Sequence, residues 1–420
     1  MDLLIENVRS FEGRHHIPLK PLSLMVGENS TGKSTVLAML TAALNPEFPV
    51  AARLFNTPPF DLGTFSTIAT HRGGKYGRAK KFRVGMSEAS NDPCAFAATF
   101  IEGRGQPAVS HLSIEKDGES LDLHFSADSI SGSARLNLNG ERKAITERKF
   151  HVKVPPAIPS IRALIATAVV AGGETPLESA EALPRVFELT RMSPKDKWQR
   201  AIPLAPIRMK PRRTFDQADE QFDPEGQHVP YLLSRLERDE TREQMWSALR
   251  NFGKEAGLFS DIQIKNFGDK PGDPFQIQVK TGGPWVNLMD VGYGVSQSLP
   301  IVVQSALGRA RDVVLLQQPE VHLHPRAQAA LGTLLARLIG AKERFMIETH
   351  SDYLVDRVRI EIAQGTVKAS DVQILFFERT ALDSKIYPLA FDEKGNIENA
   401  PRSFREFFIK EEMRLLARGK

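Results

Sequence analysis

The segment at residues 27–34 constrains the fold more than any other part of this 420-residue chain. It reads Gly-Glu-Asn-Ser-Thr-Gly-Lys-Ser and matches the pattern G-x-x-x-x-G-K-[ST] at every position. An apolar, strand-like run at residues 22–26 precedes it, and a run of good helix formers at residues 36–44 follows it. The strand–loop–helix setting that such a loop needs is therefore present.

Each residue type in this loop has a chemical reason. Glycine at positions 27 and 32 lets the backbone approach phosphate oxygens without a Cβ clash, and the loop amides together with the start of the next helix face the anion. Lys33 adds a positive charge for the outer phosphates, and Ser34 adds a hydroxyl for Mg²⁺. We therefore predict a nucleoside triphosphate site, whose binding residues are Gly27, Glu28, Asn29, Ser30, Thr31, Gly32, Lys33, Ser34 and Thr35.

The rest of the chain shows three patterns. Residues 60–154 hold short alternating runs separated by turn residues, which predict an antiparallel meander. Residues 159–258 carry mainly helical signals, interrupted by a Pro-rich basic stretch at 202–216. The last part alternates strand and helix, which predicts a parallel sheet. Its expected elements are a helix after Gly294, strands at 313–316 and 344–348, and helices at 326–339 and from 351 onward, after a separate strand at 275–281.

Composition excludes several protein classes. Hydrophobic residues make up 41% and charged residues 25%, which argues against wholesale disorder. The single cysteine, Cys94, leaves no internal disulfide and favours a reducing compartment. Charges at Asp2, Glu6 and Arg9 argue against a signal peptide, and the longest apolar run, at 163–171, falls short of the roughly 20 residues that span a bilayer. We expect a cytoplasmic protein that contacts no membrane, with two or three domains or with one large α/β domain that carries an insertion.

Five segments resemble the ABC-type ATPases that include the SMC, RecF and OLD-like proteins. Residues 5–35 resemble the start of these proteins, residues 288–302 their signature segment, and residues 313–325 their Walker B strand and D-loop-like turn. Residues 345–355 resemble their switch-histidine strand, and residues 399–416 are also similar. The matches stand in the expected order and cover about half of the chain.

The resemblance implies an α/β fold, a P-loop NTPase of ABC-ATPase type. Its mixed core sheet would carry an antiparallel β lobe and a helical insertion, without a long coiled coil, because the sequence holds no sustained heptads. We expect the nucleotide-binding head at residues 1–58 and 286–420, the β lobe at 59–156, and a mainly helical insertion at 157–285. ATP and Mg²⁺ are the implied ligands.

A second glycine-rich helix start lies at residues 292–297. Gly292, Gly294, Ser296 and Gln297 could form a second anion-binding surface, or they could simply cap the helix. The resemblance implies that this signature segment of one subunit closes on the ATP held by its twin. That geometry implies a homodimer, or a higher even oligomer, with two sandwiched nucleotides.

The Walker B segment departs from the family pattern. Gln317 and Gln318 stand where members usually carry the acids that orient Mg²⁺ and polarise the attacking water, and glutamine cannot act as a base at pH 7. Hydrolysis could be slow, Glu320 could supply the carboxylate unless it is only a solvated turn acid, or Glu348 could supply it. The predicted catalytic residues are Lys33, Gln318, Glu320 and His350, and the predicted metal ligands are Ser34 and Gln317.

Histidines follow two of the predicted strands. The resemblance implies that His350 contacts the γ-phosphate and senses its presence, although a place beside the helix cap without any ligand is an alternative. His322 and His324 lie one residue apart but have no further ligand at metal-site spacing. An interface role in their turn fits better.

Two basic clusters are candidates for nonspecific contact with DNA or RNA. Phosphate contacts release counterions, so either cluster could bind nucleic acid, although a protein partner or a solvated face is equally compatible. The clusters run from Lys75 to Arg83, with Arg78, Lys80 and Lys81, and from Arg208 to Arg213, with Lys210 and Arg212.

Three functions follow as hypotheses. The first is an ATP-hydrolysing switch subunit that dimerises through its heads and regulates a separately encoded, nuclease-like effector in bacterial anti-phage defence. About 70 residues follow the histidine strand, which we expect to be too few for an effector domain of ordinary size. The second is a DNA repair or recombination ATPase of the RecF or SMC kind, and the third is a non-hydrolysing, ATP-bound scaffold.

Overall fold

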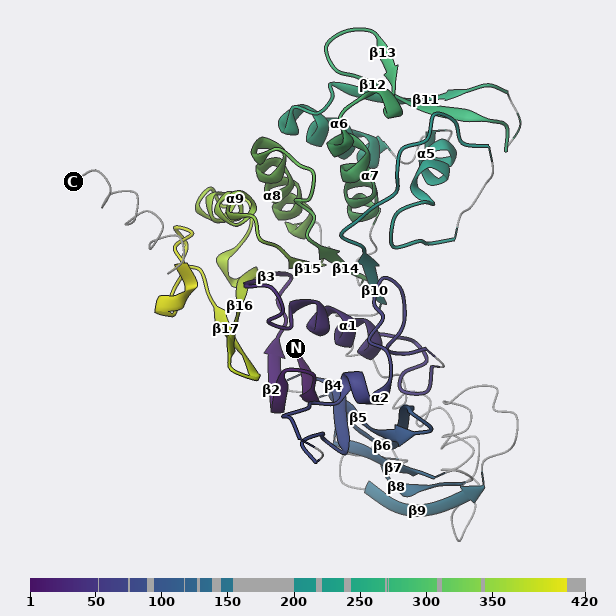
Figure 1. The fold of residues 1–420 in the computed structure, drawn as a ribbon, viewed down its shortest axis with the longest axis vertical. Coiled ribbons are helices and arrows are strands. Elements are labelled where there is room, and N and C mark those ends of the chain that lie inside the picture. The colour runs from purple at the N-terminus through teal and green to yellow at the C-terminus, as the bar shows by residue number, and fades with distance from the viewer. Residues whose placement is uncertain are drawn as a thin grey trace, which may run out of the picture. The chain divides into compact units, whose positions relative to one another are not determined.

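The described part of the chain divides into two compact units (Figure 1). The first comprises Met1–Leu19, Thr35–Ala201 and Arg379–Ser384, and the second comprises Lys20–Ser34, Ile202–Glu378 and Lys385–Lys420. The computed structural model describes residues 1–51, 53–74, 76–88, 94–116, 118–126, 129–137, 145–153, 200–216, 221–237, 243–268, 270, 272–307, 312–340 and 344–405.

The first unit is built on an eight-stranded antiparallel sheet, with strand order β2-β1-β4-β5-β6-β7-β8-β9. From β4 to β9 each strand pairs with the next one in sequence, so the predicted meander is confirmed. Buried Phe82 stacks on Phe100 with ring centroids 5.2 Å apart, and Phe55 meets Phe100 edge to face. The elements are β1 (Asp2–Val8), β2 (Phe11–Pro18), α2 (Phe65–Ile68), β4 (Lys81–Glu88), β5 (Cys94–Gly103), β6 (Gln106–Lys116), β7 (Glu119–Phe125), β8 (Ser129–Asn137) and β9 (Ile145–Lys153).

The second unit centres on a six-stranded sheet with the order β10-β14-β15-β3-β16-β17. The pairs β14–β15, β15–β3 and β3–β16 are parallel, which confirms the parallel sheet predicted from the strand–helix alternation. Its strands are β3 (Leu22–Gly27), β10 (Arg200–Leu204), β14 (Asp312–Gln317), β15 (Arg344–Glu348), β16 (Val372–Thr380) and β17 (Asp383–Leu389).

Helices accompany this sheet, and α8 lies beside α9 (Figure 1). They are α7 (Tyr293–Ala306), α8 (Pro325–Gly340) and α9 (Asp352–Ala363), and α1 (Lys33–Ala43) begins in this unit with its first two residues. The central strands are apolar and almost wholly buried, as expected of a parallel sheet covered by helices. None of the described helices combines the length and apolarity that crossing a bilayer requires.

A smaller antiparallel sheet completes the second unit, with strand order β11-β12-β13. It shares one hydrophobic core with the neighbouring helices. The elements are α5 (Val229–Glu237), α6 (Glu243–Ala256), β11 (Asp261–Asn266), β12 (Phe275–Lys280) and β13 (Trp285–Asn287), with 3-10 turns η2 (Leu288–Asp290), η3 (Ala369–Asp371) and η4 (Arg402–Arg405). Of the expected helical insertion at 157–285, residues 157–199 lie outside the described residues, and the described remainder holds α5 and α6 together with strands β10 to β13. The three domain ranges remain a proposal.

Candidate functional site: a phosphate loop and its carboxylates

The glycine-rich loop leaves the sheet between two parallel neighbours. β3 ends at Gly27 and α1 begins at Lys33, and β3 pairs with β15 on one side and β16 on the other. The carboxyl edge of parallel strands is where α/β folds bind ligands. Gly27 has φ 151°, and a Cβ there would lie 2.3 Å from the carbonyl oxygen of Phe377 on β16, so any other residue would clash.

Lys33 is folded into the loop that it follows. Its side chain is buried, and its Nζ donates hydrogen bonds to the carbonyl oxygens of Gly27, at 2.9 Å, and Glu28, at 2.8 Å. The Thr31 hydroxyl also donates to Glu28, at 2.8 Å. Burial lowers the pKa of Lys33, while Glu348, Glu28 and Glu320 counteract it. The loop thus carries a preplaced ammonium at its centre.

The other residues of the loop differ in their exposure to solvent. Glu28, Asn29, Ser30 and Ser34 are exposed, whereas Thr31 and Thr35 are buried. Ser30 has φ 62° and Gly32 has φ 100°, so the loop backbone passes through the left-handed region twice. Such alternation turns successive N–H groups toward one concave side, as anion-binding loops require.

Glu348 is the carboxylate that reaches the serine of the loop. Ser34 Oγ donates to Glu348 Oε2 at 2.7 Å, across 314 residues of sequence. Glu348 ends β15 opposite Met25 of β3 on one side and Gln317 of β14 on the other. Burial raises the pKa of Glu348, and the hydrogen bond from Ser34 and the charge of Lys33 counteract it. Carboxylate, hydroxyl and amide oxygens are hard ligands, so this donor set fits Mg²⁺.

Glu320 is held in the turn after β14. Its Oε2 accepts from the Thr349 hydroxyl at 2.9 Å, and its Oε1 accepts from the backbone N–H of His350 at 2.7 Å. Burial raises the pKa of Glu320, and these hydrogen bonds counteract it. Gln318, at φ 41°, donates its N–H to the Glu348 carbonyl oxygen at 2.8 Å. Glu320 is therefore no solvated turn acid, because it ties its turn to the end of β15.

His350 stands between this turn and α9. Its backbone is fixed by Glu320 while its side chain is exposed. Despite this exposure, partial desolvation lowers the pKa of His350, and the nearby charge of Lys33 lowers it further, which favours the neutral imidazole. Ser351 is the residue that caps α9, because its hydroxyl accepts from the Leu354 N–H at 3.0 Å.

Comparison with known proteins places the chain in a family. The family model described as "AAA domain, putative AbiEii toxin, Type IV TA system" matches residues 22–356. The chain belongs to this AAA-domain family. It is 22% identical to the OLD nuclease of Thermus scotoductus over 402 residues, which are 91% of this chain and 65% of that relative. The resemblance to OLD-like ATPases is thereby confirmed at the level of the family.

Solved structures of SMC heads are also similar. The SMC head bound to the C-terminal winged-helix domain of ScpA matches with a TM-score of 0.49 and 12% identity, covering 93% of this chain and 98% of that one. The SMC head of Thermotoga maritima matches with a TM-score of 0.43 and 10% identity, covering 92% and 97%.

The prediction that Arg208 belongs to an exposed basic cluster is wrong. Arg208 is 2% exposed, so this AAA-domain chain cannot offer it to nucleic acid as part of a surface cluster. Its guanidinium donates to the Pro319 carbonyl oxygen at 3.4 Å. Burial lowers the pKa of Arg208 to about 10, and the charge of Glu320 counteracts it. The residues around it at 202–209 are mostly apolar, and this feature of the sequence could have indicated that Arg208 is buried.

The signature segment is partly inside the molecule. Gly292 is exposed at the start of α7, and nothing surrounds the place where its Cβ would be. Ser296 and Gln297 are buried, contrary to the expectation that they face a nucleotide. Ser296 donates to the Tyr293 carbonyl oxygen at 2.9 Å. The Gln297 amide accepts from the Arg208 N–H at 3.1 Å and donates to the carbonyl oxygens of residues 208 and 209.

Gly294 and the two basic clusters complete the set of predicted residues. A Cβ at Gly294 would lie 2.9 Å from the His322 carbonyl oxygen, and the rings of Tyr293 and His322 meet edge to face. Of the basic clusters, Lys80, Lys81, Lys210, Arg212 and Arg213 are exposed, Arg78 and Arg83 are partly buried, and Lys75 lies outside the described residues. Arg213 pairs with Asp290 at 2.7 Å.

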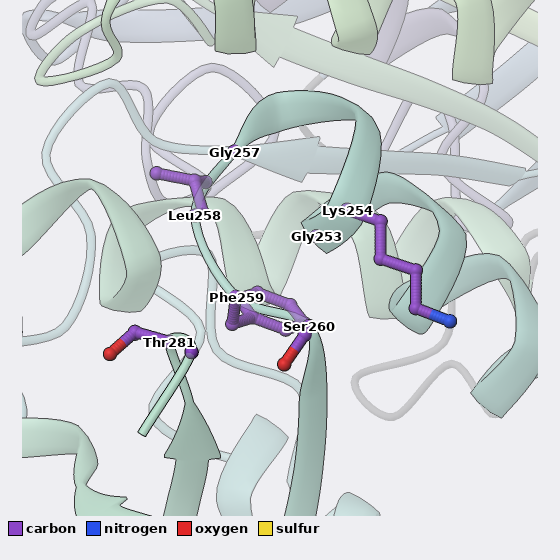
Figure 2. A pocket seen from close by; sticks show the side chains of 8 residues that line it. Gly253, Lys254, Gly257, Leu258, Phe259, Ser260 and Thr281 are labelled. Carbon is purple, nitrogen blue, oxygen red and sulfur yellow. The ribbon is translucent and has the colours of Figure 1, made fainter.

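A pocket of about 290 Å³ lies at a different place in the second unit, beside the carboxyl end of α6 (Figure 2). One of its lining residues, Leu258, approaches Gly294 of the signature segment. The pocket contains none of the phosphate-loop residues. Its lining is Gly253, Lys254, Gly257, Leu258, Phe259, Ser260, Thr281 and Gly282.

Proposed function

We propose that this AAA-type ATPase binds ATP at residues 27–34 and hydrolyses it with Glu348 in place of the usual Walker B acid. The hydrogen bond of 2.7 Å between Ser34 and Glu348 carries the proposal. A carboxylate next to the serine of the loop is what the family's usual acid would provide, and Gln317 leaves that role open. Because Glu348 lies on the neighbouring strand, its carboxylate reaches the same edge of the sheet.

Mg²⁺ would be held by Ser34 and Glu348, with the amide oxygen of Gln317 beside them. When bound, the ion would neutralise charge on the phosphates. Lys33 would release its carbonyl partners and turn its ammonium to the phosphate oxygens. Glu320 would act as a positioning residue, because it orients the backbone of His350, whose neutral imidazole would donate to the γ-phosphate.

Exchanging the carboxylate tests this assignment. Glu348→Gln should lower phosphate release by about 10²-fold, the usual cost of losing one charge-stabilising group. Calorimetry should show weaker ATP binding with Mg²⁺ and unchanged binding in EDTA. The double variant Gln317→Asp/Glu348→Gln should recover part of the Mg²⁺ dependence, since it restores one carboxylate.

Exposed Glu393→Gln is the matched control and should behave like the wild type. Normal turnover and normal Mg²⁺ dependence in Glu348→Gln would contradict the role of Glu348. If the wild type releases no phosphate under any condition, with or without DNA, and retains ATP through purification, the protein is an ATP-bound scaffold instead.

We further propose that ATP joins two heads through Gly292 and that the closed dimer regulates a separately encoded, nuclease-like effector in anti-phage defence. A ligand that bridges two chains stabilises only the closed state, so the pair would open once the γ-phosphate is lost. The similarity to a protein named OLD nuclease supports a nuclease partner. Because the chain spans 65% of that relative, the relative's whole activity stays a proposal here.

A further inference from the structure

Two histidines and an aspartate converge on one face of the eight-stranded sheet. His111 of β6 lies directly opposite His124 of β7, and Asp122 lies two residues before His124 on the same strand. Residues two apart on a strand point to the same face, and so do directly opposed residues, so all three side chains share one side of the sheet. This histidine–aspartate cluster has no part in the nucleotide site.

The distances join the three side chains into one group. Nε2 of His111 lies 3.0 Å from Oδ2 of Asp122, and Nε2 of His124 lies 3.2 Å from Oδ1. The two imidazole centroids are 4.8 Å apart. The three candidate ligand atoms all lie within 4.8 Å of one another. In a tetrahedral zinc site with bonds near 2.0 Å, ligand atoms are about 3.3 Å apart, which requires only small side-chain rotations here.

The register that creates the cluster is fixed by the opposite face. Leu112, Leu121 and Leu123 alternate with the cluster residues along β6 and β7, and all three are buried. A slip of one residue would expose these leucines, so the sheet strongly disfavours any pairing that separates the cluster. The cluster is therefore preorganised by the hydrophobic core and not by its own contacts.

We propose that His111, Asp122 and His124 bind one zinc-class divalent ion. Two imidazoles and a carboxylate suit late first-row divalent metals, and three protein ligands leave at least one position for water. The side chains of Asp122 and His124 are 46% and 63% exposed, so the ion has an open path. Arg83, which donates to Ser113 on the same face, places a positive charge nearby and keeps the affinity below that of a closed structural site.

Cobalt and zinc titrations of the full-length protein test the proposal. Chelator-stripped protein in excess Mg²⁺ should bind one equivalent of Co²⁺, read by its visible absorption, and Zn²⁺ should displace it. His111→Gln, Asp122→Asn and His124→Gln should each weaken binding by at least 10-fold, since changes outside a metal's direct ligands already cost 10–100-fold. Zn²⁺ should also raise the Tm of the wild type, because binding to the folded state alone stabilises it.

His151→Gln is the matched control. His151 lies on the same face of the sheet, separated from His124 by Ser131 of β8, and is exposed. Its loss should leave the Co²⁺ spectrum unchanged. No saturable Co²⁺ signal, or equal binding by wild type and the exposed His124→Gln variant, would overturn the proposal and leave a histidine pair bridged by Asp122.

Discussion

At the scale of single residues, the site combines two buried groups of opposite charge. Lys33 and Glu348 are 3% and 7% exposed, and burial disfavours the charged form of both. Their mutual attraction counteracts that penalty without abolishing the shift of either pKa. Groups with shifted pKa values gather at functional sites, because the fold holds them for a ligand and not for its own stability.

The pH dependence of stability should reveal the ionisation of Glu348. Its folded pKa is raised, so ionisation costs the folded state free energy, and stability falls as pH rises through that value. Glu348→Gln should therefore have a nucleotide-free Tm that gains on that of the wild type as pH rises through and above the usual range of a glutamate. Thermal unfolding across this range checks it, with exposed Glu393→Gln as control. A variant Tm that falls progressively below the wild type would contradict the assignment.

At the scale of elements, α7 links the signature segment to the interior through buried polar groups. Gln297 is fully buried and bonds three backbone groups of residues 208 and 209. Ser305, on the same helix, is also fully buried, but its hydroxyl has no hydrogen-bond partner in the described chain. Similar burial with opposite hydrogen bonding makes the two residues a matched pair.

Removing these side chains should have opposite consequences. Gln297→Leu leaves three backbone groups without partners and should lower the free energy of unfolding by about 3 kcal/mol. Ser305→Ala removes an unsatisfied hydroxyl and should be neutral or slightly stabilising. Denaturant unfolding measures both. Equal destabilisation by the two variants would show that packing, and not hydrogen bonding, sets the cost.

At the scale of the whole molecule, the proposed dimer depends on the exposed start of α7. A side chain at Gly294 would clash with the His322 carbonyl oxygen and disturb the fold of the single chain. A substitution there could therefore not separate an effect on folding from an effect on dimer assembly. Gly292 is exposed, and a Cβ there meets nothing within 4 Å. It is therefore the cleaner position for testing contact between subunits.

Gly292→Asp should abolish the ATP-dependent dimer while leaving ATP binding by the single chain intact. A carboxylate at the signature would repel the γ-phosphate held by the other subunit. Sedimentation with Mg²⁺ and ATP measures assembly, and calorimetry measures binding. Gly283→Asp is the control, because Gly283 is also exposed with open space around its Cβ. A Gly292→Asp protein that still dimerises with ATP would rule out a signature-mediated pair.

Features of the fold could be predicted from the sequence where they depend on a short, continuous stretch of residues. The strand–loop–helix setting of residues 27–34, the meander and the parallel strands follow from glycine placement, from alternation and from strand–helix succession, each of which can be recognised within a dozen residues. Prediction did not succeed where a side chain's environment comes from distant segments. Arg208 resembled a surface cation because three basic residues follow it, yet contacts with residues 297 and 319 bury it.

The amino-acid sequence alone was enough to determine the strand–loop–helix segment around residues 27–34 and the class of fold, since these depend on backbone conformation and on hydrophobic periodicity. The family followed from the resemblance of several motifs to those of known proteins. Only the tertiary structure decided which carboxylate meets Ser34, where Gln297 points, and that His111, Asp122 and His124 form one group. These contacts depend on strand order and register, which arise when the whole core packs.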